Sequence, residues 1–99
     1  MLTKHQQQLY NAFYESTHNN EYLDQKTEIL VGLSAAMAMN CAPCTHYYLK
    51  QAKQANISKN EISEVIAKVM AVAAGQKRLQ MQEVVEAYNI NLEAHDQNP

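Results

Sequence analysis

The sequence predicts an all-α protein, a compact subunit of about five helices. Glycine and proline occur only twice each in 99 residues, too few for a turn-rich β protein. Apolar residues recur three and four positions apart along most of the chain, which is the spacing of a helix face, and no alternating strand pattern is present. A chain of this length makes one domain, so we expect residues 1–99 to fold as a single unit.

The first helix is predicted over residues 4–18. Thr3 precedes it and is a favourable N-cap residue. Its apolar side consists of Leu9, Tyr10, Phe13 and Tyr14. The polar segment "THNNEY" then breaks the helical pattern, because such side chains compete for the hydrogen bonds of the helix backbone.

The second helix is predicted over residues 25–39, with Asp24 as its N-cap. From Ile29 onward the segment "ILVGLSAAMAM" is apolar almost all round. Such a helix has few polar positions to turn toward water. We therefore expect it to lie at the centre of the fold, or to pack against a partner subunit on its second side.

The third helix is predicted to begin at residue 42 or 43 and to end near Ala55. Pro43 favours this start, because proline lacks the N–H that the first turn of a helix leaves unpaired. Asn56 is the expected stop.

Two further helices are predicted over residues 59–74 and 76–91, separated by an interruption at Gly75. Ser58 stands three positions before Glu61, which is a capping-box spacing at the start of the first of them. Their apolar stripes consist of Ile62, Val65, Ile66, Val69, Met70 and Ala73, and of Met81, Val84, Val85, Tyr88 and Leu92.

Charge and hydropathy exclude two classes of partner. The net charge is −2 and the charges of both signs are interspersed, so no basic stripe favours nucleic acid. The longest apolar run, residues 29–39, is too short to cross a bilayer. We see no apolar signal core near the start and expect a cytoplasmic protein. In that reducing compartment a close cysteine pair is more often catalytic or metal-binding than structural.

The two cysteines of the chain, Cys41 and Cys44, lie at the start of the third predicted helix in the segment "CAPC". The i, i+3 spacing places both thiols on one side, within reach of a disulfide. Unpaired N–H groups at a helix N-terminus favour the thiolate, which attacks disulfides and peroxides. Two other interpretations stay open: a pair of small buried apolar residues, or half of a zinc site shared between subunits. His46 is too close in sequence to complete a tetrahedral site easily.

The chain resembles the carboxymuconolactone decarboxylase and alkylhydroperoxidase-D-like family from about Leu23 to Tyr88. "KTEILVGLSAAMAMN" is similar to the apolar helix of that family, which is followed by a C-x-x-C at the start of the next helix. "YLKQAKQANISKNEISEVI" and "IAKVMAVAAG" are similar to the segments that come next. The order and spacing of these segments are more specific than the cysteines alone.

The resemblance implies a helical subunit that assembles into trimers or hexamers. Peroxidase members reduce hydroperoxides with the dithiol, assisted by a glutamate and histidine proton relay, and a partner protein then reduces the disulfide. Members without the cysteines decarboxylate a lactone. Retention of both cysteines places this chain nearer the thiol branch. The resemblance implies that Cys44 attacks and that Cys41 meets the reductant, with no metal or organic cofactor.

The proton relay of the family is altered in this chain. The histidine expected four positions after the second cysteine is replaced by Tyr48, and His46 points about 200° away on a helix. The relay glutamate is expected at the position of Ile29, and Glu28 lies about 100° around the helix from it. A one-residue insertion in the turn before Cys41 would bring Glu28 into line.

Each of these side chains therefore has two interpretations. Tyr48 shares a helical face with Cys44 and is able to donate a hydrogen bond to a thiolate, whereas Tyr47 and Tyr48 also suit aromatic packing. His46 is either a surface residue or a cation that lowers a cysteine pKa. Glu28 is either a relay carboxylate or a surface charge near Lys26. The remaining histidines, His5, His18 and His95, stand in polar or terminal segments and are predicted to be solvated.

The sequence thus favours a dithiol oxidoreductase that reduces hydroperoxides, with Cys41, Cys44, Tyr48, His46 and Glu28 as candidate catalytic residues. Its expected partners are a hydroperoxide or disulfide substrate, a protein reductant and further copies of the same chain, with no nucleic acid and no membrane. Three alternatives remain: disulfide exchange with proteins, a non-enzymatic oligomeric scaffold or redox switch, and lactone decarboxylation.

Overall fold

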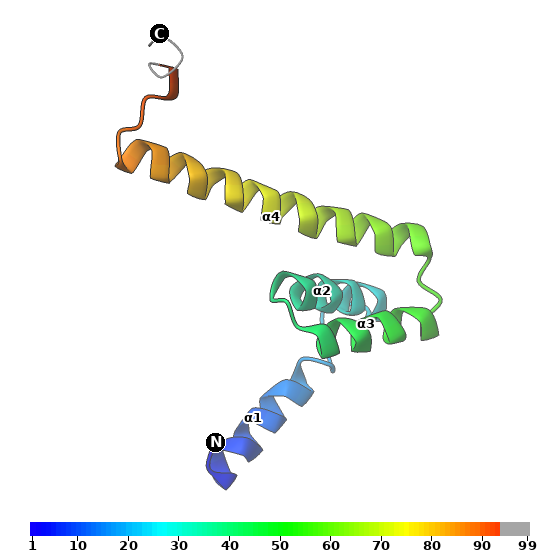
Figure 1. Ribbon diagram of the computed structural model, residues 1–99. Helices are drawn as coiled ribbons and strands as arrows, with labels where there is room; N and C mark the ends of the chain where they lie inside the picture. The colour runs from blue at the N-terminus through cyan, green and yellow to red at the C-terminus, as the bar shows by residue number, and fades with distance from the viewer. Residues whose placement is uncertain (94–99) are drawn as a thin grey trace.

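The computed structural model describes residues 1–93 and shows four helices and no strand in them (Figure 1). The helices are α1 (Lys4–Ser16), α2 (Gln25–Ala38), α3 (Ala42–Gln54) and α4 (Lys59–Ala87). The predicted all-α class is confirmed. The first three predicted helices are present, with ends that differ by no more than a turn.

The predicted break at Gly75 is wrong, and the two last predicted helices form the single 29-residue helix α4. A glycine inside a helix costs only about 1 kcal/mol relative to alanine, and no proline stands nearby to stop the helix. A side chain at Gly75 would meet no atom within 4 Å, so no close contact requires the glycine in this chain. Within residues 1–93 no helix is both long and apolar enough to span a membrane.

The predicted N-caps are all present. Thr3 accepts a hydrogen bond from the backbone N–H of Gln6, whose side chain accepts one from the N–H of Thr3. Asp24 Oδ1 accepts a hydrogen bond of 2.7 Å from the N–H of Thr27, and this bond lowers the pKa of Asp24. A capping box also starts α4, where Ser58 and Glu61 satisfy each other's backbone N–H groups.

Three helices end in the same way, with an asparagine in the left-handed conformation. Asn40, Asn56 and Asn89 have φ values of 56°, 58° and 55° and follow the C-caps of α2, α3 and α4. In each case the next N–H returns to a carbonyl of the last turn, which is the Schellman arrangement. Asparagine tolerates this conformation better than other non-glycine residues. The predicted stop at Asn56 is confirmed.

The internal packing centres on α2, which contacts both α3 and α4 (Figure 1). The buried apolar residues are Ile29, Leu33 and Ala36 of α2, Ala52 of α3, and Ile57 in the connection to α4. The expectation of a central second helix is therefore confirmed. Helix α1 projects away from the other three helices and makes no close backbone contact with them (Figure 1).

The chain is not the compact subunit that the sequence predicted. Its radius of gyration is 20.5 Å, whereas a compact chain of 99 residues has about 13 Å. Neither α1 nor α4 contains a buried residue. The apolar stripes predicted for these two helices are therefore largely uncovered within one chain.

The left-handed asparagines give a stability prediction. We expect Asn56→Ala to lower the free energy of unfolding by about 1–2 kcal/mol, because a Cβ without a polar partner is strained at this φ. Asn56→Gly is the matched control and should be as stable as the wild type or more so. Urea unfolding at one protein concentration, followed by circular dichroism, measures both. Equal stability of the alanine and glycine variants would contradict the assigned helix end.

Candidate active site

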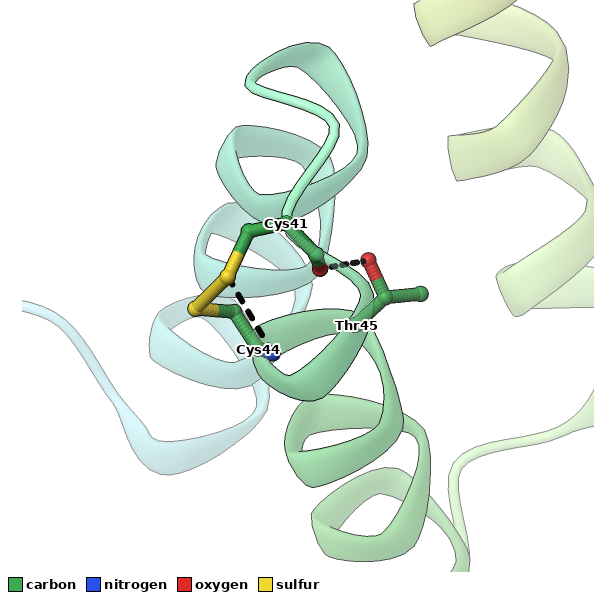
Figure 2. Close-up of a disulfide and its surroundings, with 3 residues drawn as sticks. All are labelled: Cys41, Cys44 and Thr45. Carbon is green, nitrogen blue, oxygen red and sulfur yellow. Dashed lines mark hydrogen bonds between the residues drawn. A yellow bond between two sulfur atoms is a disulfide. The ribbon is translucent and has the colours of Figure 1, made fainter.

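Cys41 lies between the end of α2 and the start of α3, and it forms hydrogen bonds with the backbone of both helices. Its backbone N–H donates to the carbonyl of Ala36 at 2.9 Å, which closes α2. Its Sγ accepts a hydrogen bond of 3.3 Å from the N–H of Cys44, which makes it the N-cap of α3. Its carbonyl accepts from the N–H and the hydroxyl of Thr45 (Figure 2). Four hydrogen bonds, three to its backbone and one to its sulfur, therefore fix the position of Cys41.

Cys41 and Cys44 form a disulfide, with their Cα atoms 5.3 Å apart (Figure 2). The expectation that both thiols reach each other across one helical turn is confirmed. Cys44 is exposed and Cys41 is half-buried, so the bond is open to an attacking group. On reduction, the N–H that points at Cys41 Sγ favours a thiolate on that sulfur, because a charged acceptor forms the stronger hydrogen bond.

A shallow recess of about 520 Å³ lies beside Cys41. Its lining residues are Met37, Asn40, Cys41, Ala42, Thr45, His46 and Leu49. His46 is thus on the Cys41 side of α3, in an exposed position. Apolar and polar side chains both line this recess, which leaves the Cys41 side of the disulfide open to solvent.

Tyr48 lies on the other side of α3, where its ring packs against α2. The ring reaches the backbone of Gly32 so closely that a Cβ on Gly32 would overlap it. Burial raises the pKa of Tyr48, and the charge of Glu28 raises it further. The phenol therefore keeps its proton at neutral pH and is able to donate a hydrogen bond, as expected from the sequence.

Glu28 lies beside Tyr48, and it is not the surface charge near Lys26 that one interpretation predicted. Its side chain is 17% exposed, and it lines a recess of about 290 Å³ together with Tyr48 and Gly32. Lys26 pairs instead with Glu61 at the start of α4, and this lysine is the main cause of the lowered pKa of Glu61. The structure thus brings Glu28 and Tyr48 together and leaves His46 apart from them.

His18 is the residue that sequence reasoning missed. It was predicted to be solvated, yet its side chain is 24% exposed and its Nδ1 lies 3.5 Å from Glu28 Oε1. Its ring centre is 4.8 Å from that of Tyr14, 5.8 Å from Tyr47 and 6.5 Å from Tyr48. No local sequence pattern around "THNNEY" predicts these contacts, because the residues that surround His18 lie in the three helices α1, α2 and α3. His5 is exposed as predicted, and His95 lies outside the described residues.

In residues 1–93, no three side chains of His, Cys, Asp or Glu are grouped closely enough to hold a metal ion.

The contact between Tyr48 and Gly32 gives a second prediction. We expect Gly32→Ala to lower the free energy of unfolding by about 1–3 kcal/mol, because the added methyl group overlaps the Tyr48 ring in a packed interface. Gly75→Ala is the matched control, and we expect it to stabilise α4 by about 0.5–1 kcal/mol because its Cβ meets open space. Chemical unfolding of both variants is the measurement. A Gly32→Ala variant as stable as Gly75→Ala would show that Tyr48 does not pack on α2.

Comparison with known proteins identifies one family. The model of the carboxymuconolactone decarboxylase family matches residues 6–87, which run from the first helix to the last residue of α4. No curated protein and no solved structure matches the chain. The match covers the disulfide, the Tyr48 side of α3 and nearly the whole helical part, in agreement with the resemblance inferred from the segments around the cysteines. The chain therefore belongs to the carboxymuconolactone decarboxylase family.

Proposed function

We propose that this protein is a thiol oxidoreductase that reduces hydroperoxides with Cys41 and Cys44. The observation that supports the proposal is the exposed disulfide across the first turn of α3, with the N–H of Cys44 directed at Cys41 Sγ. A helix N-terminus favours thiolates, and two thiols one turn apart exchange between dithiol and disulfide without a large backbone movement.

The proposed reaction has two steps and consumes one dithiol. The Cys44 thiolate attacks the outer oxygen of the hydroperoxide, the O–O bond breaks, and the alkoxide leaves as an alcohol after it takes up a proton. Cys44 is then a sulfenic acid. The Cys41 thiolate attacks its sulfur, forms the disulfide and releases water after protonation. A dithiol protein of the thioredoxin chemical class restores both thiols by disulfide exchange.

The neighbouring side chains supply different parts of this reaction in the proposal. Tyr48 stands one helical turn after Cys44 and keeps its proton at neutral pH, so it is able to donate a hydrogen bond to a group on the Cys44 side. Glu28 lies next to Tyr48 and is its charged neighbour. His46 lines the recess beside Cys41 and, when protonated, favours the thiolate of that cysteine.

Disulfide exchange with other proteins is the second candidate function. It is favoured by the exposure of Cys44 and by the open recess at Cys41, since a protein partner needs access to the sulfur more than it needs an enclosed pocket. The departure of Tyr48 from the histidine of the family pattern favours the same alternative, because exchange between thiols requires less proton delivery than cleavage of an O–O bond.

We also propose that the active form is a homo-oligomer. The accessible surface of one chain is 8630 Å², whereas a compact monomer of 11.2 kDa exposes about 5,700 Å². The difference is of the size that subunits of permanent oligomers bury. The exposed large apolar side chains of the two outer helices are Leu9, Tyr10, Phe13 and Tyr14 in α1, and Ile66, Met70, Val72, Leu79, Met81 and Val84 in α4. A second copy offers the same apolar stripes and is the simplest occupant.

Thiol counting tests the peroxidase proposal. The reduced protein should lose both thiols after one equivalent of an alkyl hydroperoxide, because the two steps above consume both sulfurs. Cys44→Ser should retain its single thiol. Cys41→Ser, the matched control, should form a sulfenic acid that a dione reagent traps. Loss of thiols with a small disulfide but not with the hydroperoxide would replace the peroxidase by the exchange function, and inertness toward both would remove both.

Light scattering coupled to size exclusion tests the oligomer. We expect a mass that is a multiple of 11.2 kDa. Met81→Glu should lower that mass, because it places a charge on the exposed apolar stripe of α4, where Met81 is 67% exposed. Gln82→Glu adds the same charge at the next position, away from the stripe, and should leave the mass unchanged. A wild-type mass of one chain would contradict the proposal.

A further inference from the structure

A groove runs along the line where α2 and α4 meet, and we call it the α2–α4 groove. Two adjoining recesses of about 340 and 280 Å³ form it, and Ser34 of α2 and Lys68 of α4 line both of them. Of the described residues that line the groove, Lys68 alone is charged. Its walls include Val31, Ala35 and Ala38 from α2, and Val69, Val72 and Ala73 from α4. The groove is therefore mainly apolar, and small side chains border much of it.

The walls of this groove remain open to solvent in one chain. Val31 is 53% exposed and Val72 is 66% exposed, and Ala35 and Ala38 are exposed as well. Positions 31, 35 and 38 recur at the spacing of one helix face. This face is the second apolar side of α2, the side that was expected to pack against a partner subunit.

Helix α1 offers a matching apolar face with large side chains. Leu9, Tyr10 and Phe13 are 58%, 52% and 66% exposed. No charged residue stands between His5 and Glu15, so burial of this face removes no charge from water. The 13 residues of α1 span about 20 Å and the 14 residues of α2 about 21 Å, so the two helices match in length. Large side chains on one helix fit between small ones on its neighbours.

The α1 of the same chain lies apart from this groove. The connection that follows it is held by the contacts of His18 with Glu28 and Tyr48. Figure 1 shows α1 leaving the α2–α3 pair on the side opposite to α4, and α1 makes no close backbone contact with either α2 or α4. The α1 of a second copy is therefore the available occupant.

We propose that α1 of one subunit occupies the α2–α4 groove of the next subunit. The contact joins two different surfaces, so each chain gives one α1 and receives another, and a ring forms when the rotation between neighbours closes. The inference rests on the proposed homo-oligomer and identifies one of its contacts. Ala38 lies at the end of the groove, three positions before Cys41, so the neighbouring subunit borders the turn that carries the disulfide.

The surface of one chain is large enough for this exchange. Its accessible surface exceeds that of a compact monomer by about 2,900 Å². A standard interface takes about 800 Å² from each partner, so a chain that gives one contact and receives another uses about 1,600 Å². The surplus covers both contacts and leaves the stripe of α4 around Met81 for a further one.

Mixing two variants tests the contact. Phe13→Glu places a charge on the apolar face of α1, and Ala73→Lys places a long charged side chain in the α2–α4 groove. Each should lower the mass measured by light scattering coupled to size exclusion, because each removes one half of the contact. An equimolar mixture should be heavier than either variant by at least one chain of 11.2 kDa. The intact α1 of the Ala73→Lys chain then fits the intact groove of the Phe13→Glu chain.

Two matched controls separate this contact from a general effect of charge. Gln8→Glu adds the same charge to α1 about 140° around the helix from Phe13, and Ala71→Lys makes the same change as Ala73→Lys about 200° around α4. Both should keep the mass of the wild type. All four positions are exposed, so each variant should keep the helical circular dichroism of the wild type. Leu9→Glu takes the place of Phe13→Glu if that variant does not fold.

The outcomes are distinct. A wild-type oligomer whose mass falls in neither variant, or in only one of them, would overturn the inference. A mixture no heavier than its components would overturn it as well, because the two surfaces would then not be each other's partners. These results leave the homo-oligomer itself in place, whereas a wild-type mass of one chain would remove both proposals.

Discussion

The hydrogen bonds of Cys41 hold the centre of this structure together. One residue closes α2 through its N–H, starts α3 through its sulfur and binds the first turn of α3 through its carbonyl. The left-handed Asn40 just before it reverses the chain within a very short connection. The sulfur of Cys41 thus caps α3 and also belongs to the disulfide. A thiolate at this position would accept a stronger hydrogen bond from the N–H of Cys44 than a disulfide sulfur does. Reduction therefore need not loosen the start of α3.

This junction gives the two cysteines different surroundings. Cys41 faces an open recess that His46 lines, whereas the face of α3 that follows Cys44 leads to Tyr48, Glu28 and α2. The separation arises from helix geometry, because positions 46 and 48 point about 200° apart. In the proposed reaction, the reductant therefore meets Cys41 on the side of the open recess, whereas Tyr48 adjoins Cys44 on the other side. That division suits a dithiol whose two sulfurs perform different steps.

Local features were predictable from the sequence, and long-range ones were not. The caps at Thr3 and Ser58 and the pairing of the cysteines depend on residues within three positions, so the sequence alone determines them. The helix through Gly75 was missed because the small cost of a glycine is offset by the good helix formers around it. The burial of His18 was missed because its partners stand ten and thirty positions away, and no periodicity links them.

The distribution of burial suggests how the site depends on assembly. The cysteines lie on the α2–α3 pair, which contains most of the buried residues, and this part is fixed by its own packing. His18 follows α1, a helix that has no buried residue and stands apart from the other helices. If a second copy covers the apolar side of α1, it also restrains the connection in which His18 lies. Subunit association would then restrain His18 and its contacts with Glu28 and the tyrosines, whereas the disulfide, which lies on the α2–α3 pair, does not depend on α1.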